Sequence, residues 1–316
     1  MRNAFAAEIT ALAQFDPRIV LLSGDIGNKL FDKFKSAAPD RFYNCGVAEA
    51  NMIGVAAGMA MTGLRPIAYT ITPFVTTRCL EQIRVDVCYH NLPVIVAGVG
   101  AGLGYANLGP THHSCEDIAF LRALPNMQVV APGDPHEVRA VLRAALAQQG
   151  PVYIRMGKKG EPTVHSDVPA DFAIGKGIVI REGDEVCILA AGTVLPLGIE
   201  AGRHLAKLGI STRVVSLHTI KPLDEALLCD LATRFKVIVT IEEHSRIGGL
   251  GAAVAQWLVE ANFKGPRLLT FATGDYFMKV AGETEYAREL YGITEEAVIA
   301  RVREAMAENS GGVASA

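Results

Sequence analysis

The sequence lacks the features that mark three large classes of protein. Its 316 residues contain no apolar run approaching the ~20 residues needed to cross a lipid bilayer. Lys and Arg number 30 and Asp and Glu 33, so there is no basic excess to attract nucleic acid or an anionic membrane. No two cysteines have the Cys-x-x-Cys spacing of zinc sites. We therefore expect this chain to bind neither nucleic acid nor a membrane and to contribute no metal ligands.

Cysteine is also scarce, and the chain has no need of a disulfide framework. Half of its residues are hydrophobic, so a large core can form, and we expect buried thiols in a reducing cytosol. The N-terminal stretch carries Glu8 inside its apolar part and lacks the continuous core of a signal peptide. Both observations predict a cytoplasmic location. The cysteines are Cys45, Cys79, Cys88, Cys115, Cys187 and Cys229.

Short apolar runs alternate with longer amphipathic stretches along the first half of the chain. Apolar strands separated by helices are typical of βαβ units, so we expect an α/β fold whose parallel sheet carries helices on both faces. The predicted strands are Ile19–Leu22, Pro66–Ile71, Pro93–Val99, Met127–Ala131 and Val152–Arg155. The predicted helices are Glu49–Thr62, Thr76–Tyr89, Glu116–Ala123 and Pro135–Gln149.

The alternation stops in the polar segment Gly157–Lys176 and then resumes in a smaller α/β unit. We expect domains at residues 1–160 and 180–316, joined by a linker at 161–179, with a disordered tail from Asn309 to Ala316. The predicted strands of the second unit are Val186–Ala190, Thr212–Leu217, Val237–Ile241 and Leu268–Phe271. Its predicted helices are Leu195–Leu208, Leu223–Phe235, Gly251–Ala261 and Thr294–Met306.

Polar residues gather where the strands of the first domain end, which is where parallel sheets bind ligands. Asp25 and Ile26 follow the first strand, and Glu49 opens an almost entirely apolar helix. Glu49 has two interpretations. It can be a charge that favours the helix dipole, or a partly buried acid that shares a proton with a heterocyclic ligand.

Two loops add further candidates. The run Gly98–Gly104 reads G-x-G-x-G-x-G, but neither phosphate-binding motif is complete, and turn geometry accounts for the glycines. The adjacent His112 and His113 indicate acid–base or hydrogen-bonding work more than metal ligation. Lys158 and Lys159 are either a solvated charge pair or an anion-binding pair.

Together these segments resemble the C-terminal half of transketolase and, more distantly, 1-deoxyxylulose-5-phosphate synthase and the β-subunits of 2-oxo acid dehydrogenases. The resemblance covers nearly the whole chain and implies a pyrimidine-binding domain of thiamine diphosphate enzymes followed by a transketolase C-terminal domain. It is carried by Pro39-Asp-Arg-Phe, Gly46-Val-Ala-Glu49-Ala-Asn-Met, Leu80-Glu-Gln-Ile-Arg84, Gly109-Pro-Thr-His112, Leu121-Arg-Ala-Leu-Pro125, Ile241-Glu-Glu-His244 and Gly248-Gly-Leu-Gly251.

The resemblance implies a cofactor site for thiamine diphosphate. Glu49 matches the glutamate that bonds N1′ of the aminopyrimidine, where a shared proton promotes loss of the cofactor's C2 proton. Asp25 and Ile26 match positions near the cofactor. The aromatic residue that stacks on the pyrimidine falls at Val75 without gaps, so Phe74 takes this role only with a one-residue shift.

The resemblance also implies catalytic and substrate-binding residues. His112 matches the histidine near the cofactor's 4′-amino group and the substrate carbonyl oxygen. Arg78, His113 and Lys158 fall at or beside substrate-binding positions, with Lys158 in place of an arginine that binds a sugar phosphate. Glu49 and His112 are therefore the expected catalytic residues.

Two departures leave the acceptor sugar unidentified. Gly100 replaces a substrate-binding histidine of ordinary transketolases, and Leu108 replaces an aspartate that contacts a substrate hydroxyl. The Gly-Asp-Gly motif that holds the diphosphate and Mg²⁺ is also missing from the sequence. We therefore expect the metal ligands on a separate N-terminal transketolase subunit, in an α2β2 assembly.

The expected activity is transfer of a two-carbon ketol unit from a ketose to an aldose. A decarboxylating reaction, as in deoxyxylulose-phosphate synthases or 2-oxo acid dehydrogenases, is the alternative enzyme. A partner subunit without catalytic function is the third interpretation, and the presence of both Glu49 and His112 argues against it.

Overall fold

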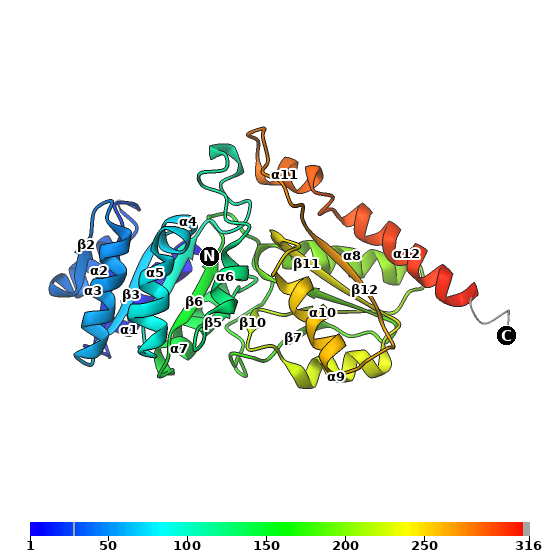
Figure 1. Cartoon of the computed structure of the whole chain (residues 1–316), viewed down its shortest axis with the longest axis horizontal. Coiled ribbons are helices and arrows are strands. Elements are labelled where there is room, and N and C mark those ends of the chain that lie inside the picture. Colours follow the sequence, from blue (N-terminus) through cyan, green and yellow to red (C-terminus); the bar gives the residue numbers. More distant parts are fainter. Residues whose placement is uncertain (28, 312–316) are drawn as a thin grey trace.

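The computed structural model describes residues 1–27 and 29–311, in which two β-sheets lie side by side along the long axis of the molecule (Figure 1). The first sheet has the order β10-β5-β6-β4-β3-β1-β2, and every neighbouring pair is parallel except β10 and β5. Its strands are β1 Ile19–Ser23, β2 Phe42–Asn44, β3 Arg65–Ile71, β4 Ile95–Val99, β5 Gln128–Val130, β6 Val152–Met156 and β10 Thr219–Lys221.

Helices cover both faces of the first sheet, as the buried apolar strands require. On one face pack α1 (Arg2–Ala13), α2 (Asp32–Ala37) and α7 (Pro135–Ala147). On the other face pack α3 (Glu49–Met61) and α6 (Asp117–Ala123), together with the broken helical segment 72–89. The predicted parallel α/β fold is confirmed, although α1, α2 and β2 were not anticipated.

Segment 72–89 does not contain the single helix that the sequence predicts at Thr76–Tyr89. It consists of α4 Thr72–Val75, η2 Thr77–Cys79, α5 Leu80–Gln82 and the π-helix η3 Ile83–Tyr89. The hydroxyl of Thr76 donates to the Thr72 carbonyl oxygen at 2.7 Å, and the backbone leaves helical geometry at Thr76 (φ −110°, ψ −78°). Such hydroxyl-to-backbone bonds compete with helix formation. The breaks set the positions of Phe74 and Arg78.

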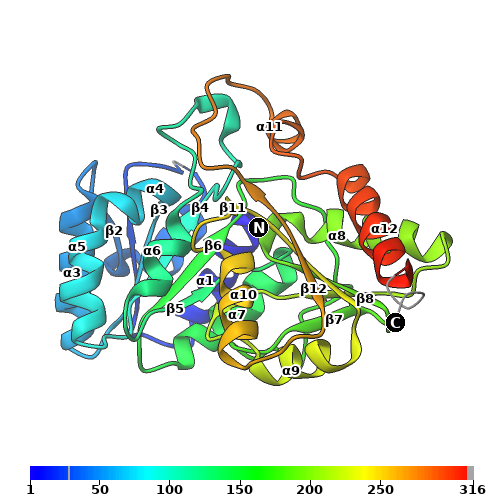
Figure 2. The same cartoon turned by 45° about the vertical axis from the view of Figure 1, so that its right-hand side comes forward.

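The second sheet has the order β12-β11-β8-β9-β7, with β7 antiparallel to β9. Helices α8 and α12 pack on one face, whereas α9 and α10 pack on the other (Figure 2). Its strands are β7 Ile178–Arg181, β8 Val186–Ala190, β9 Thr212–Ser216, β11 Val237–Ser245 and β12 Arg267–Thr273. Its helices are α8 Leu195–Lys207, α9 Glu225–Arg234, α10 Leu250–Glu260, α11 Thr284–Leu290 and α12 Glu295–Gly311.

The two halves of the chain share structure. Strand β10 belongs to the second half of the sequence, yet Thr219 pairs with Val130 at the edge of the first sheet. One apolar cluster also runs from beneath α3 to beneath α10. Above the sheets, the loop around η4 (Ala106–Leu108) packs against α11, and Thr284 Oγ1 donates to the Leu103 carbonyl oxygen at 3.2 Å.

Three smaller expectations have mixed outcomes. Helix α12 continues to Gly311, so the first part of the expected disordered tail is helical, whereas residues 312–316 lie outside the described residues. All six cysteines are unpaired, but Cys229 is exposed and Cys45 half-buried. None of the described helices is both long and apolar enough to span a bilayer.

Candidate active site

The carboxyl ends of β1 and β3 meet where the chain leaves the first sheet in opposite directions. From β1 the chain continues to the edge strand β2, and α3 then returns it to β3 on the other side of β1. Open α/β sheets bind ligands in the crevice at such a point. Glu49 is the first residue of α3, so the fold brings its carboxylate to this crevice.

Glu49 is nearly enclosed there, with 4% of its side chain exposed. Its Oε2 accepts a hydrogen bond from Arg78 Nη1 at 2.8 Å, whereas its Oε1 accepts none from any described residue. A Cβ at Gly24 would lie 2.8 Å from Thr70 Oγ1 and 3.8 Å from Glu49 Oε1. The Thr70 hydroxyl is buried without a hydrogen-bond partner among the described residues. A polar heterocycle would satisfy both the free carboxylate oxygen and this hydroxyl.

Arg78 connects Glu49 to an aromatic side chain. Its guanidinium carbon lies 4.3 Å from the centre of the Phe74 ring, and that ring meets the His112 ring edge-on with centroids 5.2 Å apart. Val75 is completely buried in the core, so Phe74 is the aromatic group that faces the crevice. Arg78 therefore pairs with Glu49 instead of standing free for substrate.

The contacts continue from His112 to the end of β6. The His112 ring lies 6.0 Å from the ring of Tyr105, and Lys158 Nζ lies 4.4 Å from the centre of the same Tyr105 ring. Because β4 and β6 are adjacent, their carboxyl ends bring Lys158 close to the loop that follows β4. We call Glu49, Arg78, Phe74, His112, Tyr105 and Lys158 the active-site row.

The other predicted site residues lie outside this row. Asp25 is exposed, and its Oδ1 accepts a hydrogen bond from Asn44 Nδ2 at 3.0 Å. Ile26 packs against the apolar cluster under α1. His113 turns back into its own loop, with Nε2 3.3 Å from the Ala106 carbonyl oxygen, and burial lowers its pKa. Lys159 is exposed.

The glycine run after β4 does not form a phosphate loop. The amides of Ala101, Gly102 and Gly104 donate to backbone oxygens, and the amide of Leu103 donates to the carboxylate of Glu243 at 3.1 Å. A Cβ at Gly102 would lie 2.6 Å from Glu243 Cβ. The run is therefore packed against the second domain by a carboxylate, which would repel a phosphate.

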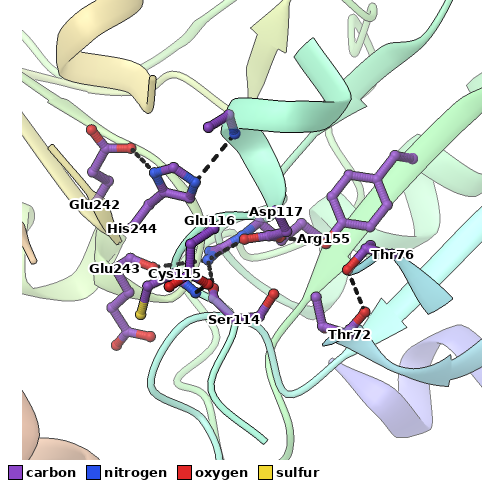
Figure 3. Close-up of polar contacts among 12 residues, drawn as sticks. Thr72, Thr76, Ser114, Cys115, Glu116, Asp117, Arg155, Glu242, Glu243 and His244 are labelled. Carbon is purple, nitrogen blue, oxygen red and sulfur yellow. Dashed lines mark hydrogen bonds and ion pairs between the residues drawn. The ribbon is translucent and has the colours of Figure 1, made fainter. Parts of the chain in front are cut away.

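A buried ionic network anchors the far end of the His112 loop (Figure 3). Arg155 Nε donates to Asp117 Oδ2 at 2.7 Å, and Arg155 Nη2 donates to the carbonyl oxygens of Ser114 and Glu243 at 2.9 and 2.8 Å. Tyr153 donates to the same Asp117 oxygen at 2.5 Å. Burial alone would raise the pKa of Asp117, but the Arg155 guanidinium, His244 and the hydrogen bonds from Arg155 and Tyr153 together leave that pKa below its usual value.

The network extends into the second domain through three consecutive residues of β11. Glu243 Oε1 accepts from Arg288 Nε at 2.6 Å. The His244 ring accepts from the Ala119 amide through Nε2 at 3.3 Å, and burial lowers its pKa to about 4, so it is neutral. Burial raises the pKa of Glu242 to about 7, against the lowering effect of two amide donors at the start of α10.

Beside Lys158, a cavity of about 520 Å³ opens between the two domains. Lys158 and Glu161 come from the segment after β6, whereas Thr193, Glu243 and Arg288 come from the second domain. This volume is large enough for a small ligand. Among the described residues, no group of three or more His, Cys, Asp or Glu side chains is arranged to hold a metal ion.

Two parts of the site escaped the sequence analysis. Tyr105 was not among the predicted site residues, and only its position in the structure shows that it lies between His112 and Lys158. Asp117 and Arg155 are 38 residues apart, so no local pattern reveals their pairing. The segment that contains Glu242, Glu243 and His244 was noticed only for its resemblance.

Known protein families and related sequences agree with this architecture. Residues 1–162 match the transketolase pyrimidine-binding domain, and residues 175–298 match the transketolase C-terminal domain. A transketolase C-terminal section of Methanocaldococcus jannaschii is 36% identical, over 97% of this chain and 96% of that protein. A subunit of 6-deoxy-6-sulfo-D-fructose transketolase from Clostridium sp. is 37% identical, over 96% of this chain and 94% of that one.

A solved structure described as a split-gene transketolase, in the form of an inactive beta4 tetramer, superposes with a TM-score of 0.89. Its sequence is 38% identical, and the match covers 97% of this chain and 98% of that one. The chain therefore belongs to the transketolase family, and it carries the pyrimidine-binding and C-terminal domains in the arrangement of the β-type subunit of a split transketolase.

Proposed function

We propose that this chain acts with a separate diphosphate-binding subunit to transfer a two-carbon ketol unit from a ketose to an aldose. The observation that carries this proposal is the placement of Glu49, a nearly enclosed carboxylate with one oxygen free, at the switch point of the sheet. A carboxylate that only stabilised a helix end would gain nothing from this enclosure.

The residues around Glu49 fit the aminopyrimidine of thiamine diphosphate. Glu49 Oε1 would meet the ring nitrogen N1′, Phe74 would cover a face of the ring, and the buried Thr70 hydroxyl would gain a partner. Asp25 and Ile26 would border the cofactor on the side of the partner subunit. When bound, thiamine diphosphate supplies the carbon atom that attacks the ketose carbonyl group.

The chain's own contribution is to hold and move protons around that carbon. Glu49 shares a proton with N1′, and the guanidinium of Arg78 holds the carboxylate in place. His112 would donate a hydrogen bond to the substrate carbonyl oxygen, and Phe74, whose ring meets the imidazole edge-on, helps to fix its orientation. The rest of the substrate would extend toward Lys158.

The positive charge of Lys158 favours a sugar that carries an anionic group. The clostridial relative is named for a sulfonated sugar, which supports an anionic substrate. Gly100 and Leu108 offer no polar side chain to sugar hydroxyls, so charge contributes most of the recognition. His113 acts on substrate only through the shape of its loop.

The partner subunit would supply the Mg²⁺ ligands, because the described residues contain no cluster of three or more His, Cys, Asp or Glu side chains that could hold a metal ion. We propose an α2β2 heterotetramer, and the beta4 assembly of the related structure supports self-association of this type of subunit. The unpaired cysteines support a cytoplasmic location. The domain boundaries that we propose are 1–160 and 180–316.

The second candidate is a decarboxylating reaction like that of deoxyxylulose-phosphate synthase. The apolar character of positions 100 and 108 favours it, because a pyruvate donor needs fewer hydroxyl contacts than a ketose. Product analysis of the reconstituted complex separates the two reactions. Ketol transfer predicts chain elongation of an aldose by two carbons with hydroxypyruvate as donor, whereas the alternative predicts a 1-deoxy sugar from pyruvate.

The need for a partner is tested by calorimetry. The purified chain alone is expected to bind thiamine diphosphate weakly and without dependence on Mg²⁺, because an isolated diphosphate has no metal clamp on this chain. Adding the diphosphate-binding subunit is expected to give Mg²⁺-dependent binding and turnover. Tight Mg²⁺-dependent binding with turnover by the chain alone would refute the split-subunit proposal.

A further inference from the structure

The Tyr105 ring fills the space that a side chain at position 100 would occupy. Gly100 follows β4 and has φ of +71°, a conformation that favours glycine. A Cβ built there would lie only 2.0 Å from the Tyr105 ring. Tyr105 is itself 9% exposed. Gly100 and Tyr105 therefore form a matched pair, in which the absence of one side chain makes room for the other.

The Tyr105 ring also contacts two members of the active-site row from different segments. Its ring is inclined at 60° to that of His112 with centroids 6.0 Å apart, and the ammonium nitrogen of Lys158 lies over its face, 4.4 Å from the ring centre. A cation over an aromatic face is attracted by the ring's quadrupole, and the attraction grows when water is partly excluded. The Lys158 side chain is long and flexible and is half-buried. Its contact with the Tyr105 ring favours one of the positions that it could otherwise adopt.

The hydroxyl of Tyr105 has no hydrogen bond with any described residue. Burial raises the pKa of Tyr105, so the phenol stays neutral. The phenol therefore adds no negative charge beside Lys158. The ammonium keeps its full charge for a ligand, while the ring fixes where that charge lies.

We propose that Tyr105 is a positioning residue, whose ring face holds the Lys158 ammonium where it can bind the anionic end of a sugar substrate. This inference rests on the proposed ketol transfer and adds a residue to the part of that site where Lys158 meets the terminal oxyanion of the sugar. Phosphate and sulfonate share this chemistry. Tyr105 acts on the substrate through Lys158 and through the volume that it fills at Gly100.

Two variants separate the ring from the hydroxyl. Tyr105→Phe keeps the aromatic face, whereas Tyr105→Leu removes it with similar apolar bulk. In the active complex with the diphosphate-binding subunit, Tyr105→Leu should raise KM for an anionic acceptor about three- to ten-fold more than it raises KM for glycolaldehyde, a neutral acceptor. Tyr105→Phe should keep the KM of the unmodified protein for both acceptors, and any change in kcat that arises from the contact with His112 should be the same for both acceptors.

Three kinetic results would overturn the proposal. They are an unchanged KM in Tyr105→Leu, an equal loss for anionic and neutral acceptors, and an equal loss in Tyr105→Phe and Tyr105→Leu. A cycle with Lys158→Met adds a check on the mechanism. Once the ammonium is gone, Tyr105→Leu should raise the anionic KM no further, and an additional loss would mean that Tyr105 acts independently of Lys158.

A measurement on the full chain alone distinguishes failure of this inference from failure of the proposed function. The lysines are labelled by reductive ¹³C-methylation, and the Lys158 resonance is assigned by its loss in Lys158→Arg. We expect a ring-current shift of this resonance in the unmodified chain and in Tyr105→Phe, which disappears in Tyr105→Leu. Inorganic phosphate should move it at about three- to ten-fold lower concentration when the ring is present.

These results decide the inference even if the complex shows no ketol transfer. A ring-current shift together with ring-dependent phosphate binding supports it. If the shift is missing, or if phosphate moves the resonance equally in all three proteins or in none, Tyr105 does not position Lys158. Near-ultraviolet circular dichroism of each variant confirms that the loop keeps its native packing.

Discussion

The carboxylate of Glu49 and the guanidinium of Arg78 form an ion pair 2.8 Å long, in which Glu49 is buried and Arg78 is 45% exposed. The pair uses only Oε2 of the carboxylate. Arg78 can therefore hold the acid in a fixed orientation while the second oxygen faces the crevice. Arg78 therefore contributes both to the stability of the buried carboxylate and to the orientation of its free oxygen.

The first prediction concerns proton transfer by Glu49. Glu49→Gln keeps the shape of the side chain but cannot exchange a proton with N1′. We expect normal folding and normal partner association, with C2 hydrogen–deuterium exchange of the bound cofactor slowed by about 10²-fold or more. NMR of quenched samples measures this exchange. An unchanged rate would reduce Glu49 to a charge at the end of a helix.

The second prediction concerns the stability of the ion pair. Arg78→Met leaves the buried Glu49 carboxylate without its partner and should lower the free energy of unfolding by about 1–3 kcal/mol. In a Glu49→Gln background the same change should cost much less, because the amide carries no charge. Urea unfolding of the four proteins gives the coupling energy. Equal costs in both backgrounds would show that the pair contributes no stability.

The third prediction concerns pH. Burial raises the pKa of Glu242 from its usual 4.5 to about 7, so the folded protein keeps this proton at higher pH than the unfolded chain. The stability linked to this proton is fully present below pH 4.5 and is lost as pH rises through 7. Glu242→Gln removes the titration and should therefore gain stability relative to the unmodified protein as pH rises from 5 to 8.

Urea unfolding of both proteins across this pH range tests that prediction. Buried His244 has a lowered pKa and loses stability in the opposite direction, as pH falls from 6.5 toward 4. His244 Nδ1 lies 4.0 Å from Glu242 Oε2, but His244 stays neutral in the folded protein above pH 5, so its contribution is nearly the same in both proteins across this range. A difference in stability that does not vary with pH would mean that Glu242 does not titrate in this window.

The fourth prediction separates backbone strain from steric overlap. Gly100 and Gly63 both have positive φ, +71° and +92°, but a Cβ at Gly63 meets no atom within 4 Å. Gly63→Ala should cost about 1 kcal/mol of stability through strain alone. Gly100→Ala should cost a further 1–3 kcal/mol or so, because it also displaces Tyr105. Equal losses would show that the Tyr105 ring moves aside freely.

The strands that the sequence predicts well are those buried on both faces. Val186–Ala190 was predicted with its observed ends, and β1, β3 and β6 differ by one residue at one end. Such strands read as continuous apolar runs because helices cover both sides of them. The shorter β2, β7 and β10 have mixed composition, since each lies at or next to a sheet edge, and they were missed.

The candidate site was predictable only in part. Glu49 and His112 stand in recognisable motifs, and the structure joins them through Arg78 and Phe74. The link from His112 to Lys158 was not predictable, because it depends on β4 and β6 ending side by side. The network around Arg155 depends on the fold of both domains, and single-sequence periodicity carries no information about such long-range pairs.

The position of β10 has a consequence for how the molecule comes apart. A break in the peptide chain between residues 160 and 179 would make β10 and β5 belong to different polypeptides, and the backbone groups at the edge of β5 would lose their partners. The same break would divide the apolar cluster that runs from beneath α3 to beneath α10. We therefore expect the two sequence domains to unfold as one cooperative unit, and each half expressed alone to expose apolar surface and unpaired backbone groups that the other half covers.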